Sequence, residues 1–227
     1  MLNIDQRSDN FTVPIALTER ALRLGLIREG SRILDPDAMQ AAARLRADKY
    51  IRELGWLSSD DIDADGGESD AYDDHATHFA VLAPDHEVGD QAVATVRFVQ
   101  RPDGQVPMRS LFPEVGRFGP ICEVSRYIAR DRIASLALRA VMVAQLLERR
   151  ATGVAMVSQD LADHLNDQGL ANQSFAGPRA AEAYDDEEQV AIALDAASTA
   201  TDERYRGLVQ LARRHDWGGL MQEAARV

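Results

Sequence analysis

The sequence predicts an α/β fold, a three-layer α/β/α sandwich with a mixed, mostly antiparallel central sheet. Two observations lead to this prediction. Segments rich in apolar and β-branched residues at 78–82, 92–99 and 121–129 follow one another as strands, with a turn after the second. A helical apolar repeat at 133–147 then precedes another strand at 153–158, the pattern of a crossover between parallel strands. Helices are therefore expected on both faces of one sheet.

The N-terminal segment predicts a separate element. Ile15, Leu22, Leu26 and Ile27 are spaced for one face of a helix within the first part of the chain. We therefore expect residues 1–37 to form an N-terminal helical extension ahead of the main domain.

The next helix has clear start and stop signals. Asp35 is a typical N-cap and Pro36 suits the first helical position, while Gly55 ends the helix after about Leu54. The residues able to face a core recur at helical spacing: Met39, Ala42, Ala43, Leu45 and Ile51. From 58 to 74 the chain is acidic and contains glycine, which indicates an exposed loop.

The last third of the chain continues the alternation. A helix is expected at 160–168 and a late strand at 189–194. We assign residues 38–200 to one α/β domain and residues 201–227 to a C-terminal helical segment.

Composition narrows the class of function. The chain has 227 residues, of which 45% are hydrophobic, enough for a sizeable core. Its formal net charge is −12. A strongly acidic surface repels phosphate backbones, so nucleic acid is not an expected partner. No apolar run approaches the roughly 18 residues that a membrane helix needs.

Cysteine usage indicates a reducing compartment. Cys122 is the only cysteine, so no internal disulfide can form, and no charged start followed by an apolar run marks a signal peptide. We therefore expect a cytoplasmic protein. Cys122 adjoins Glu123, whose charge would disfavour a thiolate, and a small apolar core residue is the favoured interpretation.

Metal binding has little support in the sequence. The acidic loop matches the first half of an EF-hand with Asp61, Asp63, Asp65 and Gly66, but Tyr72 stands where a bidentate glutamate is required. The histidines show no paired ligand spacing. No metal site is predicted, and the loop is better interpreted as a solvated segment.

Glu123 is the most informative single residue. It lies in an apolar strand, where a carboxylate has to be paired or have its pKa raised by desolvation, and a raised pKa suits a general base. On a regular strand Ser125 shares its face and Arg126 takes the other, unless a bulge redirects them. Arg126 is then free to pair with Asp70 or Asp73. A simple salt bridge within the sheet is the alternative interpretation.

Polar and aromatic residues recur in a fixed order through the middle of the chain. In sequence they are Arg46, Tyr50 and Trp56, then Glu68, Asp70, Tyr72 and Asp73, then Arg97, Phe112, and finally Glu123, Ser125 and Arg126. This ordered set resembles the acyl-homoserine-lactone synthases, the autoinducer synthases of quorum sensing, over roughly residues 38–196. The chain departs from that family in Tyr50 for the usual Phe, in a longer loop before Asp70, in the residues after Arg97 and in the extra segment 1–37.

The resemblance implies a fold similar to the GNAT acyl-CoA N-acyltransferases and a reaction in which the amine of S-adenosylmethionine attacks an acyl thioester. Lactonisation then releases methylthioadenosine, so S-adenosylmethionine is a substrate and no tightly bound cofactor is implied. The resemblance makes Glu123 the base, with Arg126, Asp70 and Asp73 holding the catalytic site in shape. The implied substrate-binding residues are Arg46, Tyr50, Trp56, Arg97, Phe112 and Ser125, the first three as a lid.

The implied donor is carried on acyl carrier protein or coenzyme A. Carrier protein is acidic, so it would dock on a local basic surface, for which the candidates are Arg130, Arg132, Arg149 and Arg150. An acetyl-CoA enzyme needs a glycine-bearing loop at the start of the crossover helix, and residues 130–135 contain no glycine, which favours carrier protein. Two alternatives stay open: an acyl-CoA enzyme acting on another amine or amino acid, and a non-catalytic binding protein on the same scaffold.

Overall fold

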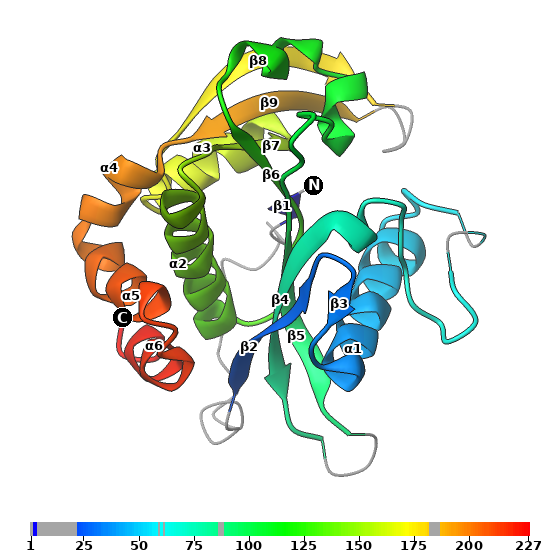
Figure 1. The fold of residues 1–227 in the computed structure, drawn as a ribbon, viewed down its shortest axis with the longest axis vertical. Coiled ribbons are helices and arrows are strands. Elements are labelled where there is room, and N and C mark those ends of the chain that lie inside the picture. Colours follow the sequence, from blue (N-terminus) through cyan, green and yellow to red (C-terminus); the bar gives the residue numbers. More distant parts are fainter. Residues whose placement is uncertain (1, 4–21, 59, 61, 86–88, 182–186) are drawn as a thin grey trace.

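The computed structural model describes residues 2–3, 22–58, 60, 62–85, 89–181 and 187–227. Its centre is a mixed sheet in the order β3-β2-β4-β5-β6-β7-β9-β8, with helices on both sides (Figure 1). The predicted three-layer α/β/α sandwich is therefore confirmed. No helix among these residues has the length and apolarity to cross a membrane.

One half of the sheet is antiparallel and is made by consecutive strands. These are β2 (Arg23–Glu29), β3 (Arg32–Ile33), β4 (Ala76–Ala83), β5 (Gln91–Val99) and β6 (Ile121–Ala129). Strand β6 then pairs in parallel with β7 (Thr152–Val157), and the antiparallel strands β9 (Glu188–Leu194) and β8 (Asn172–Ala180) complete that edge. The strands at 78–82, 92–99, 121–129, 153–158 and 189–194 are thus confirmed to within two residues at either end.

Helix α2 (Arg132–Arg149) is the crossover between the parallel strands and covers one face of the sheet. Asp131 caps it by accepting the Ala134 N–H, at 2.8 Å. The C-terminal helices α4 (Ala196–Thr201), α5 (Glu203–Arg213) and α6 (Trp217–Ala224) pack against α2 on the same side, as Figure 1 shows. Helix α3 (Gln159–Asp167) lies beside β8 and β9.

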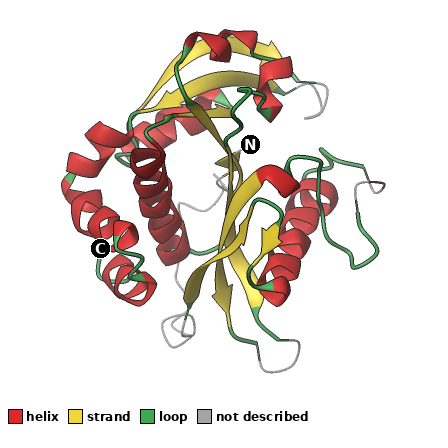
Figure 2. Cartoon of the chain, viewed as in Figure 1, coloured by secondary structure: helices red, strands yellow, loops and turns green. Residues whose placement is uncertain are grey.

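Helix α1 (Pro36–Ala47) covers the opposite face. The predicted cap is confirmed, since the Asp35 side chain accepts the Ala38 N–H at 3.0 Å. The helix continues as a π-helical segment, Asp48–Glu53, and the chain then reaches Gly55 with a positive φ of 68°. Short 3₁₀ turns at Asp73–His75, Pro107–Ser110 and Pro113–Arg117 add to this face; the last two connect β5 to β6 (Figure 2).

The N-terminal helix is wrong for the residues that the structure describes. Leu26 and Ile27 lie in β2, which hydrogen-bonds to β4 in the central sheet. Leu24 is buried in the cluster that includes α2 and Ile27 in the cluster that includes α1, so β2 is covered on both faces, and this spacing of buried residues imitates a helical face. Ile15 lies outside the described residues. The division into 1–37, 38–200 and 201–227 stays a prediction; the last of these segments contains the helices α5 and α6.

Strands β6 and β7 stay together only briefly. Their parallel pairing covers Ile121 to Glu123 on β6, opposite Thr152 to Val154 on β7. Beyond this point β1 (Leu2–Asn3) pairs with β6 at Tyr127 and Ile128. The sheet therefore opens next to Glu123, and a short extended segment of this chain lies along the far part of β6.

Candidate active site

A bulge in β6 brings Arg126 to the same face as Ser125. Thr95 pairs with Ile128, but two residues further along β5 Arg97 pairs with Ser125, so β6 holds one extra residue between them. Arg126 is at the bulge, where its backbone has a φ of 53°, a value that residues other than glycine rarely adopt. The sequence analysis placed Arg126 on the opposite face from Glu123 unless a bulge redirected it. The structure contains such a bulge, and Arg126 lies on the face that carries Glu123.

Three arginines and three carboxylates form a closed ring of alternating charge on this face. Arg46 contacts Glu68 at 2.6 Å and Asp73 at 2.6 Å. Arg97 contacts Asp73 at 2.8 Å and Asp70 at 2.6 Å, and also donates to Ser125 Oγ at 3.1 Å. Arg126 closes the ring on Asp70 at 3.1 Å and Glu68 at 2.8 Å. Each charge is therefore shared by two of the opposite sign.

Distant parts of the chain supply the ring. Arg46 comes from α1, Arg97 from β5 and Arg126 from β6, while all three carboxylates come from the acidic segment. That segment was expected to be solvated, and this is wrong for Glu68 and Asp73, which are 1% and 2% exposed, whereas Asp74 is exposed as expected. Because buried carboxylates need such partners, the ring anchors the segment to the sheet.

The first half of the acidic segment makes a local turn. Asp63 Oδ1 accepts the N–H groups of Asp65 and Gly67, at 2.9 and 2.8 Å. Gly67 then packs so closely on α1 that a Cβ there would lie 2.7 Å from the Ala43 Cβ. The aspartates that resemble a calcium loop thus direct the backbone toward Glu68. The described residues contain no group of three acidic, histidine or cysteine side chains able to hold a metal ion.

Glu123 lies beside the ring in an apolar setting. It is 4% exposed, and its Oε2 accepts the backbone N–H of Met108 at 2.8 Å. Burial raises the pKa of this carboxyl, although the Met108 N–H acts in the opposite direction. The residues around it form an apolar cluster that includes Met108, Phe112 and Ile121. Glu123 is therefore a carboxylate whose affinity for a proton is increased, as a general base requires.

The aspartates of the ring behave in the opposite way. Burial alone would raise the pKa of Asp70 and Asp73, but Arg97 beside both, together with Arg126 and Arg46, outweighs it and holds both values below their usual range. One site thus contains carboxyls whose pKa values are shifted in opposite directions, a property that accompanies acid–base roles.

His78 lies within this cluster and is fully buried. Burial first, and the neighbouring Arg46 second, lower its pKa to about 3, so the imidazole is neutral. Its Nε2 lies 3.5 Å from Asp73 Oδ1, and neither ring nitrogen has a hydrogen-bond partner among the described residues. A histidine that alternates with apolar residues on a strand favours a hydrogen-bonded side chain, and this interpretation is wrong for His78.

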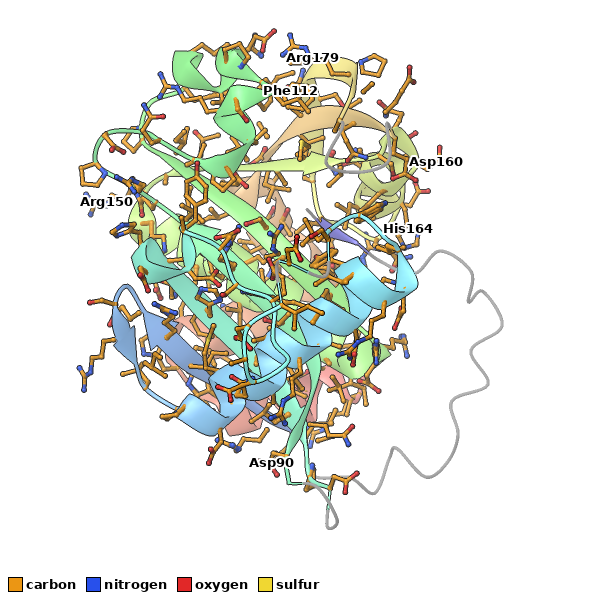
Figure 3. The ribbon with its side chains drawn as sticks, turned by 90° about the vertical axis from the view of Figure 1, so that its right-hand side faces the viewer. Asp90, Phe112, Arg150, Asp160, His164 and Arg179 are labelled. Atoms are coloured by element: carbon orange, nitrogen blue, oxygen red, sulfur yellow. The ribbon has the colours of Figure 1, made fainter. Side chains whose placement is uncertain are left out.

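The predicted aromatic residues fall into two groups. Tyr50 is 1% exposed, stacks on Trp56 with ring centres 6.0 Å apart, and lies under the Arg126 guanidinium at 5.3 Å. Phe112 belongs to the cluster around Glu123 and lies 5.0 Å from the Arg179 guanidinium; Figure 3 shows the pair at one end of the molecule. Arg46, predicted as part of a lid, is instead fully buried in the ring.

The docking arginines are not part of this cluster. Arg130 pairs with Glu53, and Arg132 donates to the Val227 carbonyl oxygen at 3.1 Å. Arg149 lies against the sheet, donating to Thr77 and Gln145, while Arg150 is exposed at the end of α2 (Figure 3).

Cys122 is fully buried on the α2 side of β6, and burial raises the pKa of its thiol to about 12. The interpretation of Cys122 as a core residue is confirmed.

The sequence analysis missed two residues that contribute to the candidate site. Glu68 was part of the motif but was not assigned a role in the site, and Met108 contributes through its backbone N–H, which leaves no signal in the sequence.

Comparisons with known proteins identify the fold. No protein-family model and no curated protein matches the sequence. Among solved structures, the CoA-dependent acyl-homoserine lactone synthase BjaI, with SAM and isopentyl-CoA, aligns with 88% of this chain and 90% of its own at 21% identity and a TM-score of 0.61.

Two further structures are similar. The AHL synthase LasI aligns with 83% of this chain and 95% of its own, at 20% identity and a TM-score of 0.59. FeeM, an N-acyl amino acid synthase from uncultured soil microbes, aligns with 85% of this chain and 99% of its own, at 18% identity and a TM-score of 0.52. On this evidence the chain has the fold of the acyl-homoserine lactone synthases.

Proposed function

We propose that this chain is an N-acyltransferase that moves an acyl group from a thioester donor to the amine of S-adenosylmethionine and so makes an acyl-homoserine lactone. The burial of Glu123 and the raised pKa of its carboxyl are the main support for the proposal. A buried carboxylate with a raised pKa, at the point where β6 and β7 separate, supports a role as the base that takes a proton from an attacking amine.

The reaction has two steps. In the first, the amine nitrogen attacks the thioester carbon, Glu123 takes the ammonium proton directly or through a water, and the thiolate leaves with a proton. In the second, the carboxylate oxygen of the acylated product attacks the carbon next to the sulfonium, which closes the lactone and releases methylthioadenosine. The charge ring holds the walls of the site, because Arg126 and Arg97 bind both the acidic segment and adjacent strands.

The similar structures support this choice of substrates. BjaI was solved with SAM and isopentyl-CoA, and another synthase of the same fold, TofI, was solved in a ternary complex with an inhibitor and MTA. TofI aligns with 79% of this chain at 19% identity and a TM-score of 0.58. The CoA dependence of BjaI supports acyl-CoA as the donor, while the carrier-protein donor rests on the missing glycine in residues 130–135.

A second candidate acceptor is an amino acid. FeeM makes N-acyl amino acids on the same fold, and attack by an amino group needs the same base. We place the reaction in the cytoplasm, with quorum sensing as the role of the product, on the strength of the single cysteine and the family resemblance.

Mass spectrometry of lipid extracts from cells expressing the chain tests the proposal. We expect an acylated homoserine lactone that is missing from cells expressing Glu123→Gln. An N-acyl amino acid instead would favour the second acceptor, and extracts with no acylated amine at all would contradict acyl transfer.

A further inference from the structure

A pocket of about 630 Å³ lies at the far end of the cluster that buries Glu123. It is lined by the turn after β5 and by the start of β6, with Arg109 and Val115 from the short 3₁₀ segments between them. This volume is in the range of small-molecule sites, and polar and apolar groups line the walls in similar measure, which suits a ligand with a charged end and a carbon chain.

Arg109 is the cation that this pocket offers. Its Nη1 donates to the Gly104 carbonyl oxygen at 2.9 Å. Cβ atoms built at Gly104 and Gly116 would lie 3.2 and 3.3 Å from the guanidinium, so the two glycines let the backbone approach it closely. In the described part of the chain Arg109 forms no ion pair, whereas Arg101 on the same wall is bound to Asp103 at 3.0 Å. The guanidinium of Arg109 is thus held in position at the pocket wall, and no carboxylate among the described residues pairs with it.

The pocket lies close to the proposed catalytic residue, which does not itself line it. Met108, whose N–H holds Glu123, directly precedes Arg109. Ile121 lines the pocket and lies on the same face of β6 as Glu123, two residues or roughly 7 Å along the strand. The arginines of the ring, by contrast, are each shared by two carboxylates. Among these cations Arg109 is the one available to a further anion.

We propose that this pocket binds a carboxylate-bearing small molecule through Arg109. A planar guanidinium pairs with a carboxylate through two hydrogen bonds, and Val115, Phe118 and Ile121 provide apolar walls for the carbon chain. The source of the carboxylate rests on the proposed function: it is either the far end of the transferred acyl chain or the carboxylate of the amine acceptor.

Calorimetric titration with glutarate tests the site without any need for activity. We expect wild type to bind glutarate and not the neutral diamide glutaramide, and Arg109→Gln to weaken binding by roughly 10-fold or more, as for loss of a charge-assisted pair. Asp103→Asn removes the carboxylate that pairs with Arg101, so this substitution should strengthen glutarate binding. Arg213→Gln, an exposed arginine on α5, is the matched control and should bind as wild type does. Equal binding by wild type and Arg109→Gln would overturn the proposal.

Kinetics with matched donors separate the two sources. If the acyl chain supplies the carboxylate, Arg109→Gln raises KM for glutaryl-CoA and leaves KM for pentanoyl-CoA unchanged. If the acceptor supplies it, the substitution raises KM for the acceptor with either donor. Unchanged KM values for all substrates would contradict a substrate site. Glutarate binding that depends on Arg109, in a protein with no transferase activity, would keep the pocket and remove the proposed function.

Discussion

Arg126 and Glu68 are joined by two hydrogen bonds that meet on one oxygen, since Nε and Nη2 of Arg126 donate to Glu68 Oε1 at 3.1 and 2.8 Å. Arg126 is 8% exposed and Glu68 is 1% exposed, so neither charge is stabilised by bulk water. The pair depends on the bulge that turns Arg126 toward the acidic segment. Stability and site geometry are therefore coupled at this residue.

Arg126→Ala should destabilise the fold by roughly 3–5 kcal/mol, because it leaves Glu68 and Asp70 with one partner fewer in a buried setting. Chemical unfolding measures the change. Arg126→Gly removes the same charge but suits the φ of 53°, so it should be the more stable of the two by about 1 kcal/mol. The exposed pair of Arg226 and Glu223 is the control, where Arg226→Ala should change stability by less than about 1 kcal/mol. A melting temperature for Arg126→Ala equal to that of wild type would show the ring to be solvated.

Acid should remove the contribution of the ring. Because the folded pKa values of Asp70 and Asp73 lie below the unfolded value of about 3.9, their stabilisation is complete well above that value and is lost progressively as the pH falls below it toward the folded values. Urea unfolding from pH 7 to pH 3 measures the onset of this loss. Asp73→Asn should be less stable at pH 7 and should lose less on acidification. Parallel losses in both proteins would assign the acid sensitivity to other groups.

Glu123→Gln should lower acyl transfer by about 10²-fold or more and leave the fold intact. A raised carboxyl pKa in the folded state means that ionising Glu123 costs stability, so its favourable contribution is present at low pH and is lost as the pH rises. The variant should therefore unfold at the same or a higher urea concentration at pH 7. In wild type, activity should rise with pH as Glu123 loses its proton. Turnover equal to wild type would remove Glu123 from the mechanism.

Reversing Arg130 and Arg132 to glutamate should raise KM for acyl carrier protein far more than KM for the amine. The expected docking is local and salt-sensitive, because exposed charges are screened beyond roughly 8 Å at physiological ionic strength. Reversing the exposed Arg213 and Arg214, at the C-terminal end of α5, is the control for a general change of charge. If acyl-CoA serves as well as the carrier-bound donor and the reversal has no effect, the CoA-dependent alternative takes precedence.

Much of the fold could be predicted because its elements carry strong local patterns. The crossover helix repeats apolar residues at helical spacing, and β4 to β6 are nearly continuous apolar strands. Strand β8 gave no such signal, because its sequence Asn-Gln-Ser-Phe-Ala-Gly-Pro-Arg-Ala is polar and half-exposed at the sheet edge. Strand β2 was mistaken for helix because it is covered on both faces, so its buried residues, Leu24 and Ile27, do not alternate with polar ones.

The sequence predicts which residues gather at the candidate site, but it does not predict the contacts from Glu68 and Met108 that complete it. Glu123, Arg126, Asp70, Asp73, Arg46, Arg97 and Ser125 do meet on one face of the sheet. Glu68 is the most buried partner of Arg126, and the turn around Asp63 directs the backbone toward it. In the sequence, the spacing of Asp63 and its neighbours suggested only half of a calcium loop. The backbone contact from Met108 depends on packing of distant residues, and no local pattern encodes it.

Acyl transfer through Glu123 is the central claim, and one measurement tests it most directly. Purified protein is incubated with S-adenosylmethionine and either acyl-CoA or acyl carrier protein thioesters of several chain lengths, and the products are quantified by mass spectrometry. The account predicts that wild type forms acyl-homoserine lactone and methylthioadenosine in equal amounts, with both reduced together about 10²-fold in Glu123→Gln. A folded wild-type protein that forms no acylated amine with any of these donors would contradict it.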